Sequence, residues 1–122
     1  AREMGKNVVF LETIEEQIEV MENLSHEKIV DFLKRVVHWS RYAKEYEKSY
    51  LDADIEKIVS FRSVFPTRHY PVIGRRDQIL YERMRFYLEE GDAVAFVGAP
   101  HIPGITRMLG AEGYQITGQR VP

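Results

Sequence analysis

Residues 93–105 read AVAFVGAPHIPGI. The first five residues are small or β-branched and apolar, and they predict a buried strand. The strand ends at Gly98, which opens a turn with one histidine, two prolines and two glycines. A helix over residues 105–110 and a short strand over residues 114–117 then complete a βαβ unit. Ligands of open α/β sheets bind just beyond the carboxyl ends of the strands, and His101 lies at that position.

Working outward, a second apolar run over residues 7–11 predicts a central strand. Thr13 and Glu16 form a capping box that starts a helix after it. Helical spacing of apolar residues predicts further helices, and Pro66, Pro71 and Gly74 predict a loop between the last two. The expected helices cover residues 13–23, with Ile14, Ile18 and Met21 inward, and residues 25–37, 39–50, 52–63 and 75–90. The expected fold class is α/β, with helices covering a small, mostly parallel sheet of about three strands.

The composition indicates one ordinary globular domain over residues 1–122. The net charge of −2 gives no basic surface of the kind that binds nucleic acid, so no nucleic-acid partner is expected. The chain has no cysteine, which excludes disulfides and thiolate chemistry. No apolar run approaches the roughly 20 residues of a membrane span.

Two features lead us to expect that the chain continues upstream of Ala1. Residues 1–5, AREMG, are typical of the end of a helix with Gly5 as its stop signal. Three strands that are apolar on both faces also need neighbours, so we expect the sheet to be part of a larger one. The missing strands would come from a preceding segment or from a partner chain, and an exposed sheet edge would allow a homodimer.

The polar residues that follow the strands are the candidate site. Glu12 follows the first strand and His101 the second, so parallel strands would bring a carboxylate and an imidazole to one edge of the sheet. Such a pair binds a divalent metal or carries out acid–base chemistry. Each residue also has a structural explanation: Glu12 suits the start of a helix, and a loop histidine often bonds to the backbone. Two ligands alone are too few for a catalytic zinc site.

The triplet Arg75-Arg76-Asp77 starts the last long helix. An arginine there can clamp a carboxylate or stabilise an oxyanion. Capping chemistry and solvated charges explain the same residues. Farther upstream, Tyr42, Tyr46 and Tyr50 are spaced four apart, as on an amphipathic helix with a tyrosine edge or on an aromatic ridge that binds peptides.

Three motifs in this order resemble the TraB/GumN family, whose relatives include the TIKI metalloproteases. The segment GKNVVFLETIEEQ at residues 5–17 resembles the family's GK-x-V-x-x-LET-x-x-EQ pattern. The triplet at residues 75–77 resembles E-R-N/D, with Arg75 in place of glutamate. Residues 97–105, VGAPHIPGI, resemble VGAGH-L/V-PGI, with Pro100 in place of a small residue, and the LL-x-x-x-GY-x-V pattern follows at residues 108–116.

The resemblance implies a site in which two G-x-x-H motifs, a glutamate and an arginine meet around a divalent metal. The expected metal is Mn²⁺ or Co²⁺, with Zn²⁺ also possible. In this chain Gly98 and His101 match the second G-x-x-H, and Glu12 and Arg76 match the glutamate and the arginine. Asp77, Pro100 and Gly104 complete the matched motifs. The first G-x-x-H belongs to an N-terminal half, so we expect this chain to be a C-terminal fragment.

The resemblance therefore implies the C-terminal half of a metal-dependent peptidase or hydrolase, inactive alone and acting in full length on a peptide or small protein. Glu12 and His101 would be metal ligands or acid–base groups, and Arg76 would clamp the substrate. The alternative is a non-catalytic module of the pheromone-sequestering type, which binds a peptide through the tyrosine edge and the loop at residues 65–70. The resemblance also implies a location in the cell envelope.

Overall fold

The computed structural model of the protein describes residues 2–61, 64–66 and 70–119. The secondary structure of these residues is entirely helical. The α-helices are α1 (Ile14–Glu22), α2 (His26–Lys34), α3 (Trp39–Leu51), α4 (Ile55–Ser60), α5 (Tyr70–Glu90) and α6 (Ile102–Ala111). Short 3₁₀ helices are η1 (Arg2–Met4), η2 (Val36–His38) and η5 (Ala99–His101).

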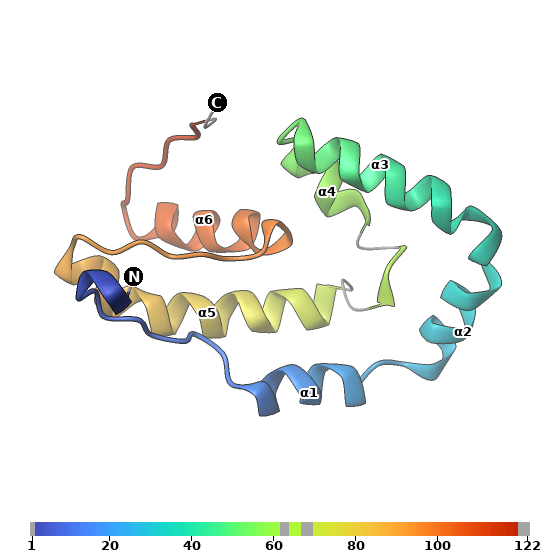
Figure 1. Cartoon of the computed structure of the whole chain (residues 1–122), viewed down its shortest axis with the longest axis horizontal. Coiled ribbons are helices and arrows are strands. Elements are labelled where there is room, and N and C mark those ends of the chain that lie inside the picture. Colours follow the sequence, from blue (N-terminus) through green and yellow to red (C-terminus); the bar gives the residue numbers. More distant parts are fainter. Residues whose placement is uncertain (1, 62–63, 67–69, 120–122) are drawn as a thin grey trace.

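The helices α5 and α6 lie side by side and contact one another along their length (Figure 1). The 3₁₀ helix η5 leads directly into α6 and contacts both α4 and α5. Helices α1, α2 and α3 follow one another in an arc around the outside of α5, and α3 and α4 pack together (Figure 1). The loop that carries His101 is therefore enclosed by α4, α5 and α6.

Helix α5 is longer than the sequence pattern predicts, because it begins at Tyr70 and includes the second half of the loop expected over residues 65–74. Pro71 is the second residue of the helix, where a missing N–H breaks no intrahelical hydrogen bond. Gly74 lies inside the helix, where it costs about 1 kcal/mol relative to alanine. The prediction of a loop at residues 65–74 was therefore wrong from Tyr70 onward, while residues 67–69 lie outside the described part.

The hydrophobic core lies between α5 and α6. Its fully buried members come from both helices, and partly buried side chains from residues 11 and 97 pack against them. The cluster consists of Leu80, Tyr81, Met84 and Ile105, with Leu11, Leu88, Val97, Met108 and Leu109 around it. This core fixes the position of α6 on α5, and with it the position of η5.

An aromatic cluster joins α2, α3 and α4. The Phe32 and Trp39 rings stack with centroids 4.5 Å apart, and the Trp39 Nε1–H donates to the Phe32 carbonyl at 3.1 Å. Tyr46 packs edge-on against both Phe61 and Phe65. Tyr46 is therefore half-buried in this cluster and does not form part of an exposed tyrosine ridge.

The predicted α/β fold with a small parallel sheet is wrong, because the described residues contain no strand. Residues 7–11, 93–97 and 114–117 form non-helical segments instead, and no backbone hydrogen bond joins one of them to another. A strand exists only with a hydrogen-bonded partner, and none of these three segments provides one for another. Leu11 and Val97 pack against the core, but most of the other apolar side chains remain uncovered, with Phe10 76% and Phe96 93% exposed.

The inward stripe predicted for the first helix is also wrong. The side chains of Ile14, Ile18 and Met21 are exposed, because α1 contacts α5 through ion pairs of its acidic residues Glu16 and Glu19. The whole chain exposes 9473 Å². A compact monomer of 14.3 kDa would expose about 6,800 Å². The difference is large enough to show that several apolar faces are not covered by any of the described elements.

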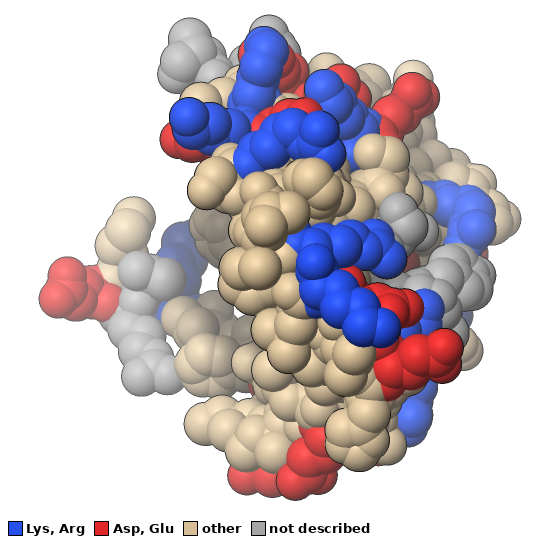
Figure 2. All heavy atoms as spheres, turned by 90° about the vertical axis from the view of Figure 1, so that its right-hand side faces the viewer, with Lys and Arg blue, Asp and Glu red and all other residues tan. Residues whose placement is uncertain are grey.

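The charged side chains are of both signs and are mixed. On the side of the molecule nearest α2, lysines and arginines alternate with acidic residues around an uncharged area (Figure 2). Val30, Leu33, Val36 and Val37 are the large apolar residues of α2 and η2 that remain exposed. Within the described residues, none of the helices combines the length and apolar character that crossing a membrane requires.

Candidate functional site

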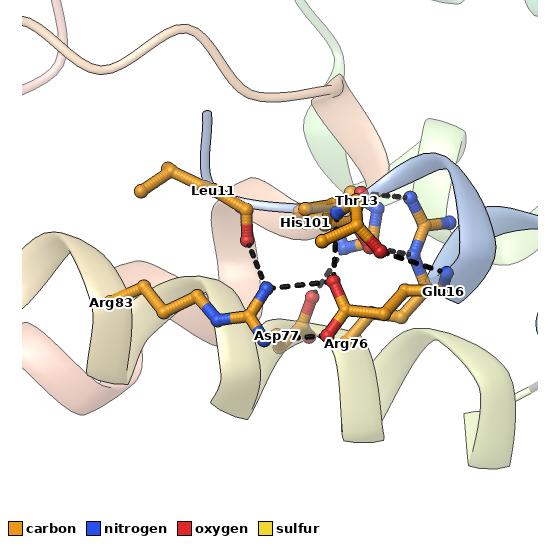
Figure 3. Close-up of polar contacts among 8 residues, drawn as sticks. Leu11, Thr13, Glu16, Arg76, Asp77, Arg83 and His101 are labelled. Atoms are coloured by element: carbon orange, nitrogen blue, oxygen red, sulfur yellow. Dashed lines mark hydrogen bonds and ion pairs between the residues drawn. The ribbon is translucent and has the colours of Figure 1, made fainter. Parts of the chain in front are cut away.

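Helix α5 brings the candidate site together by presenting two adjacent residues to different neighbours. Successive helical residues point about 100° apart. Arg76 accordingly reaches Glu12 just before α1, and Asp77 reaches His101 at the end of η5 (Figure 3). The sequence-based expectation placed these groups at a shared sheet edge, whereas the structure brings them together over one turn of a helix.

Glu12 and Arg76 form a two-bond ion pair. The Arg76 Nε–H donates to the Glu12 Oε1 at 2.7 Å, and the Nη2–H donates to the Oε2, also at 2.7 Å. The side chains are only 24% (Arg76) and 13% (Glu12) exposed. The hydrogen bonds from Arg76 lower the pKa of the Glu12 carboxyl, and the nearby His101 ring also contributes to this lowering. Glu12 and His101 therefore lie within electrostatic reach of one another.

The second pair, Asp77 and His101, is more deeply buried. The His101 Nδ1 lies 2.6 Å from the Asp77 Oδ1, and the side chains are 8% (His101) and 6% (Asp77) exposed. Carboxylate oxygens accept hydrogen bonds, so the imidazole nitrogen is the donor. The other ring nitrogen, Nε2, has no hydrogen-bond partner among the described residues.

The loop around His101 is held by local backbone geometry. The His101 N–H donates to the Gly98 carbonyl at 2.9 Å, which closes the turn of η5, and Pro100 lies in its first turn. A Cβ on Gly98 would be 3.6 Å from the His101 ring, an ordinary contact. Sterically, then, Gly98 is not required at this position, although the sequence pattern singled it out.

Gly104 has a clear steric role. It lies in the first turn of α6, facing Asp77 of α5. A Cβ on Gly104 would collide with the Asp77 carboxylate. The last glycine of the VGAPHIPGI segment therefore leaves the space that Asp77 occupies.

Arg83 is a site residue that the sequence analysis missed. It follows Arg76 by seven residues, or about two helical turns, and so projects from the same face of α5. Its Nη1–H donates to the Leu11 carbonyl at 2.8 Å and to the Glu16 Oε2 at 2.7 Å. The hydrogen bond from Arg83 is the largest cause that lowers the pKa of Glu16 from 4.5 to about 2. The signal in the sequence was the seven-residue spacing of Arg76 and Arg83, which places both on one helix face, together with the acidic residues Glu12 and Glu16 that could pair with them.

The capping box explains how Glu16 serves two partners. The Thr13 N–H donates to the Glu16 Oε2 at 2.8 Å, and the Glu16 N–H donates to the Thr13 hydroxyl at 3.2 Å. The predicted capping box is thus confirmed. Arg76 holds the Glu12 side chain, and Arg83 holds the Leu11 carbonyl before it and the Glu16 side chain after it. The LET-x-x-E segment therefore docks on α5 mainly through charge pairs (Figure 3).

A cavity of about 350 Å³ adjoins this ion-pair network. Its walls are mainly the apolar side of α1, and Arg76 lies at its edge. The lining residues are Ile14, Gln17, Ile18, Val20, Met21 and Arg76. The cavity therefore combines an apolar wall with a guanidinium group that also belongs to the candidate site.

The fit of these residues to a divalent metal is partial. His101 is well suited, because metal-binding histidines commonly donate their other ring N–H to a carboxylate, as His101 does to Asp77. Glu12 already accepts two hydrogen bonds from Arg76, although each carboxylate oxygen can accept a second partner. The part of the chain described by the structure contains no cluster of three or more potential ligands.

Comparisons with known proteins give one match. No curated protein and no solved structure matches the chain. The profile of the TraB/PrgY/gumN family matches residues 1–118 and so includes all of the motifs described above. The chain belongs to the TraB/PrgY/gumN family.

Proposed function

We propose that this chain supplies one half of the active site of a metal-dependent peptidase. The observation that carries the proposal is the buried Asp77–His101 pair, which orients an imidazole and leaves its Nε2 without a partner in the described residues. Family membership agrees with a shared site but does not specify the reaction.

In this proposal the Nε2 of His101 holds the ion, and Glu12 is the second candidate ligand. A bound divalent ion would polarise the scissile carbonyl group and activate a water molecule. A catalytic metal takes about three protein ligands, so the remaining donors come from outside the described residues.

Arg76 is suited to bind the substrate. Its Nε and Nη2 are engaged by Glu12, which leaves the N–H groups of Nη1 for a substrate oxygen. Because Glu12 holds the guanidinium in one orientation, Arg76 can stabilise developing negative charge without first reorganising. Glu12 is a weak base in this arrangement, since Arg76 lowers the pKa of its carboxyl group.

Calorimetric titration of the chain with Co²⁺, Mn²⁺ and Zn²⁺ tests the proposal. We expect weak binding that His101→Ala abolishes and that His26→Ala, an exposed histidine on α2, leaves unchanged. Sub-micromolar binding that survives His101→Ala would overturn the assignment of His101 as a ligand.

A second candidate function is a non-catalytic peptide-binding module, and the cavity beside α1 favours it. The apolar wall suits an apolar side chain, and Arg76 suits a carboxylate. The tyrosine edge is less suitable, because Tyr46 packs in the aromatic cluster.

Fluorescence anisotropy separates the two functions. The probes are a labelled apolar pentapeptide with a free carboxyl terminus and its carboxyl-terminal amide. The module predicts binding of the free acid without metal, lost in Ile18→Asp and unchanged in His101→Ala. Equal binding of the acid and the amide would contradict a role for Arg76.

A further inference from the structure

We infer that Asp77 and Gly104 are positioning residues that fix the tautomer of His101. Asp77 holds the ring through Nδ1, and Gly104 provides the space in which the Asp77 carboxylate lies. The inference rests on the proposed function only in one respect, namely that the free Nε2 binds a metal ion. The tautomer itself is a property of this chain.

The tautomer follows from the hydrogen bond. A neutral imidazole carries one proton, and the carboxylate at 2.6 Å from Nδ1 requires that proton on Nδ1. The lone pair is then on Nε2, the nitrogen that can bind a metal or accept a proton. Both side chains are almost fully buried, so water competes poorly for this hydrogen bond.

The position of Asp77 depends in turn on the crossing of α5 and α6. Gly104 and Ile105 are buried in the first turns of α6, and Ile105 packs in the core with Leu80 and Met84. This packing prevents α6 from moving away to make room for a side chain at residue 104. A methyl group there displaces the Asp77 carboxylate, and His101 loses its partner although both residues are still present.

Gly110 provides a matched control on the same helix. A Cβ on Gly110 would meet its nearest neighbour, the Ile116 Cδ1, at 3.7 Å, which is an ordinary contact. Gly104→Ala and Gly110→Ala therefore make the same chemical change in α6, and only the first reaches Asp77.

Long-range ¹H–¹⁵N correlation spectra of the imidazole rings measure the tautomer directly. The ¹⁵N-labelled chain is studied at pH 8, above the ordinary histidine pKa of about 6.5, and His101→Gln identifies the His101 signals among the four histidines. We expect protonated Nδ1 and unprotonated Nε2 in the wild type and in Gly110→Ala. In Asp77→Ala and Gly104→Ala we expect the proton to shift toward Nε2.

Retention of the wild-type pattern in folded Asp77→Ala or Gly104→Ala would overturn the inference. If Gly104→Ala fails to fold, the double variant Asp77→Gly/Gly104→Ala removes the whole Asp77 side chain, including its Cβ 3.0 Å from the added methyl group, and should recover helical circular dichroism. A double variant that remains unfolded would show that Asp77 is not what Gly104 accommodates. The metal titration is independent: a tautomer that responds as expected without His101-dependent binding would overturn the proposed function and leave the positioning role standing.

Discussion

Among the Arg–Glu pairs of the described residues, Glu12–Arg76 should be the strongest, and a double-mutant cycle can measure its coupling. The variants are Glu12→Ala, Arg76→Ala and the combination. The cycle isolates the pairwise coupling, because effects of each residue on other neighbours cancel.

The structure sets the expected magnitude. The pair has two charge-assisted hydrogen bonds of 2.7 Å, each of a type that contributes about 1.5–3 kcal/mol when well formed. Desolvation of two charges opposes this gain, and partial exposure of Arg76 weakens it further. We therefore expect a coupling of about 2 kcal/mol, or roughly a 30-fold change in the unfolding equilibrium.

Arg85 and Glu89 provide the matched control on the same helix. Their Nε–Oε1 distance is also 2.7 Å, but half of each side chain is exposed. Solvent screening should bring their coupling close to zero, and added salt should weaken it more than it weakens the Glu12–Arg76 coupling.

Urea unfolding at pH 7, followed by far-ultraviolet circular dichroism, provides the free energies of unfolding. The slopes with urea must agree among the four members of each cycle for the comparison to hold. A Glu12–Arg76 coupling no larger than that of Arg85–Glu89 would refute the reasoning, because burial and bidentate geometry are the only differences invoked.

Three further predictions concern other parts of the structure. Arg83→Gln should lower the urea midpoint of unfolding at pH 6. The difference in midpoint between the variant and the wild type should disappear as the pH falls from about 4.5 toward 2. Because the pKa of Glu16 is lowered in the folded state, its pair with Arg83 stabilises the fold above pH 4.5, and this stabilisation is lost when Glu16 is protonated. Tyr81→Phe should leave the midpoint nearly unchanged, since no hydrogen bond of ordinary geometry reaches its buried hydroxyl among the described residues, although burial and the nearby Glu112 carboxylate raise the pKa of Tyr81. A large loss in thermal unfolding would reveal such a bond. Ile105→Ala removes core contacts and should lower the free energy of unfolding by about 2–4 kcal/mol, whereas Ile18→Ser, at an exposed position, should lower it far less. Equal losses of stability in urea for the two variants would show that Ile18 of α1 is part of the core.

Local signals in the sequence predicted local structure well. The capping box at Thr13 and Glu16 depends on residues three apart, and the structure contains both of its hydrogen bonds. The start of α5 was misplaced because Pro71 was taken as a helix breaker, whereas proline is tolerated in a first helical turn.

The sheet prediction failed for a different reason. An apolar run such as residues 93–97 shows that a segment needs cover, but it does not show that another strand lies within reach. In the structure no partner strand is present in the described part of the chain, and Val94 and Phe96 remain exposed. Strand formation depends on distant residues, which a periodic pattern cannot identify.

The sequence motifs grouped the candidate residues but did not indicate which of them pair with one another. The motifs named Glu12, Arg76, Asp77 and His101, and the structure gives each of them a partner within this group. Which carboxylate pairs with which cation depends on the rotation of α5, a three-dimensional property. Arg83 was missed for the same reason, because its role appears only when Leu11 and Glu16 lie across the helix.

The adjacency of Arg76 and Asp77 has a consequence for how the site responds to change. Both pairs depend on one turn of α5, so a rotation of that turn would weaken both at once, whereas Gly104 and Arg83 each act on one pair alone. Gly104 constrains Asp77 from the α6 side, and Arg83 constrains the backbone beside Glu12 from the α1 side. A substitution at either position should therefore disturb its own pair and leave the other intact, which separates local positioning from a general loss of helix α5.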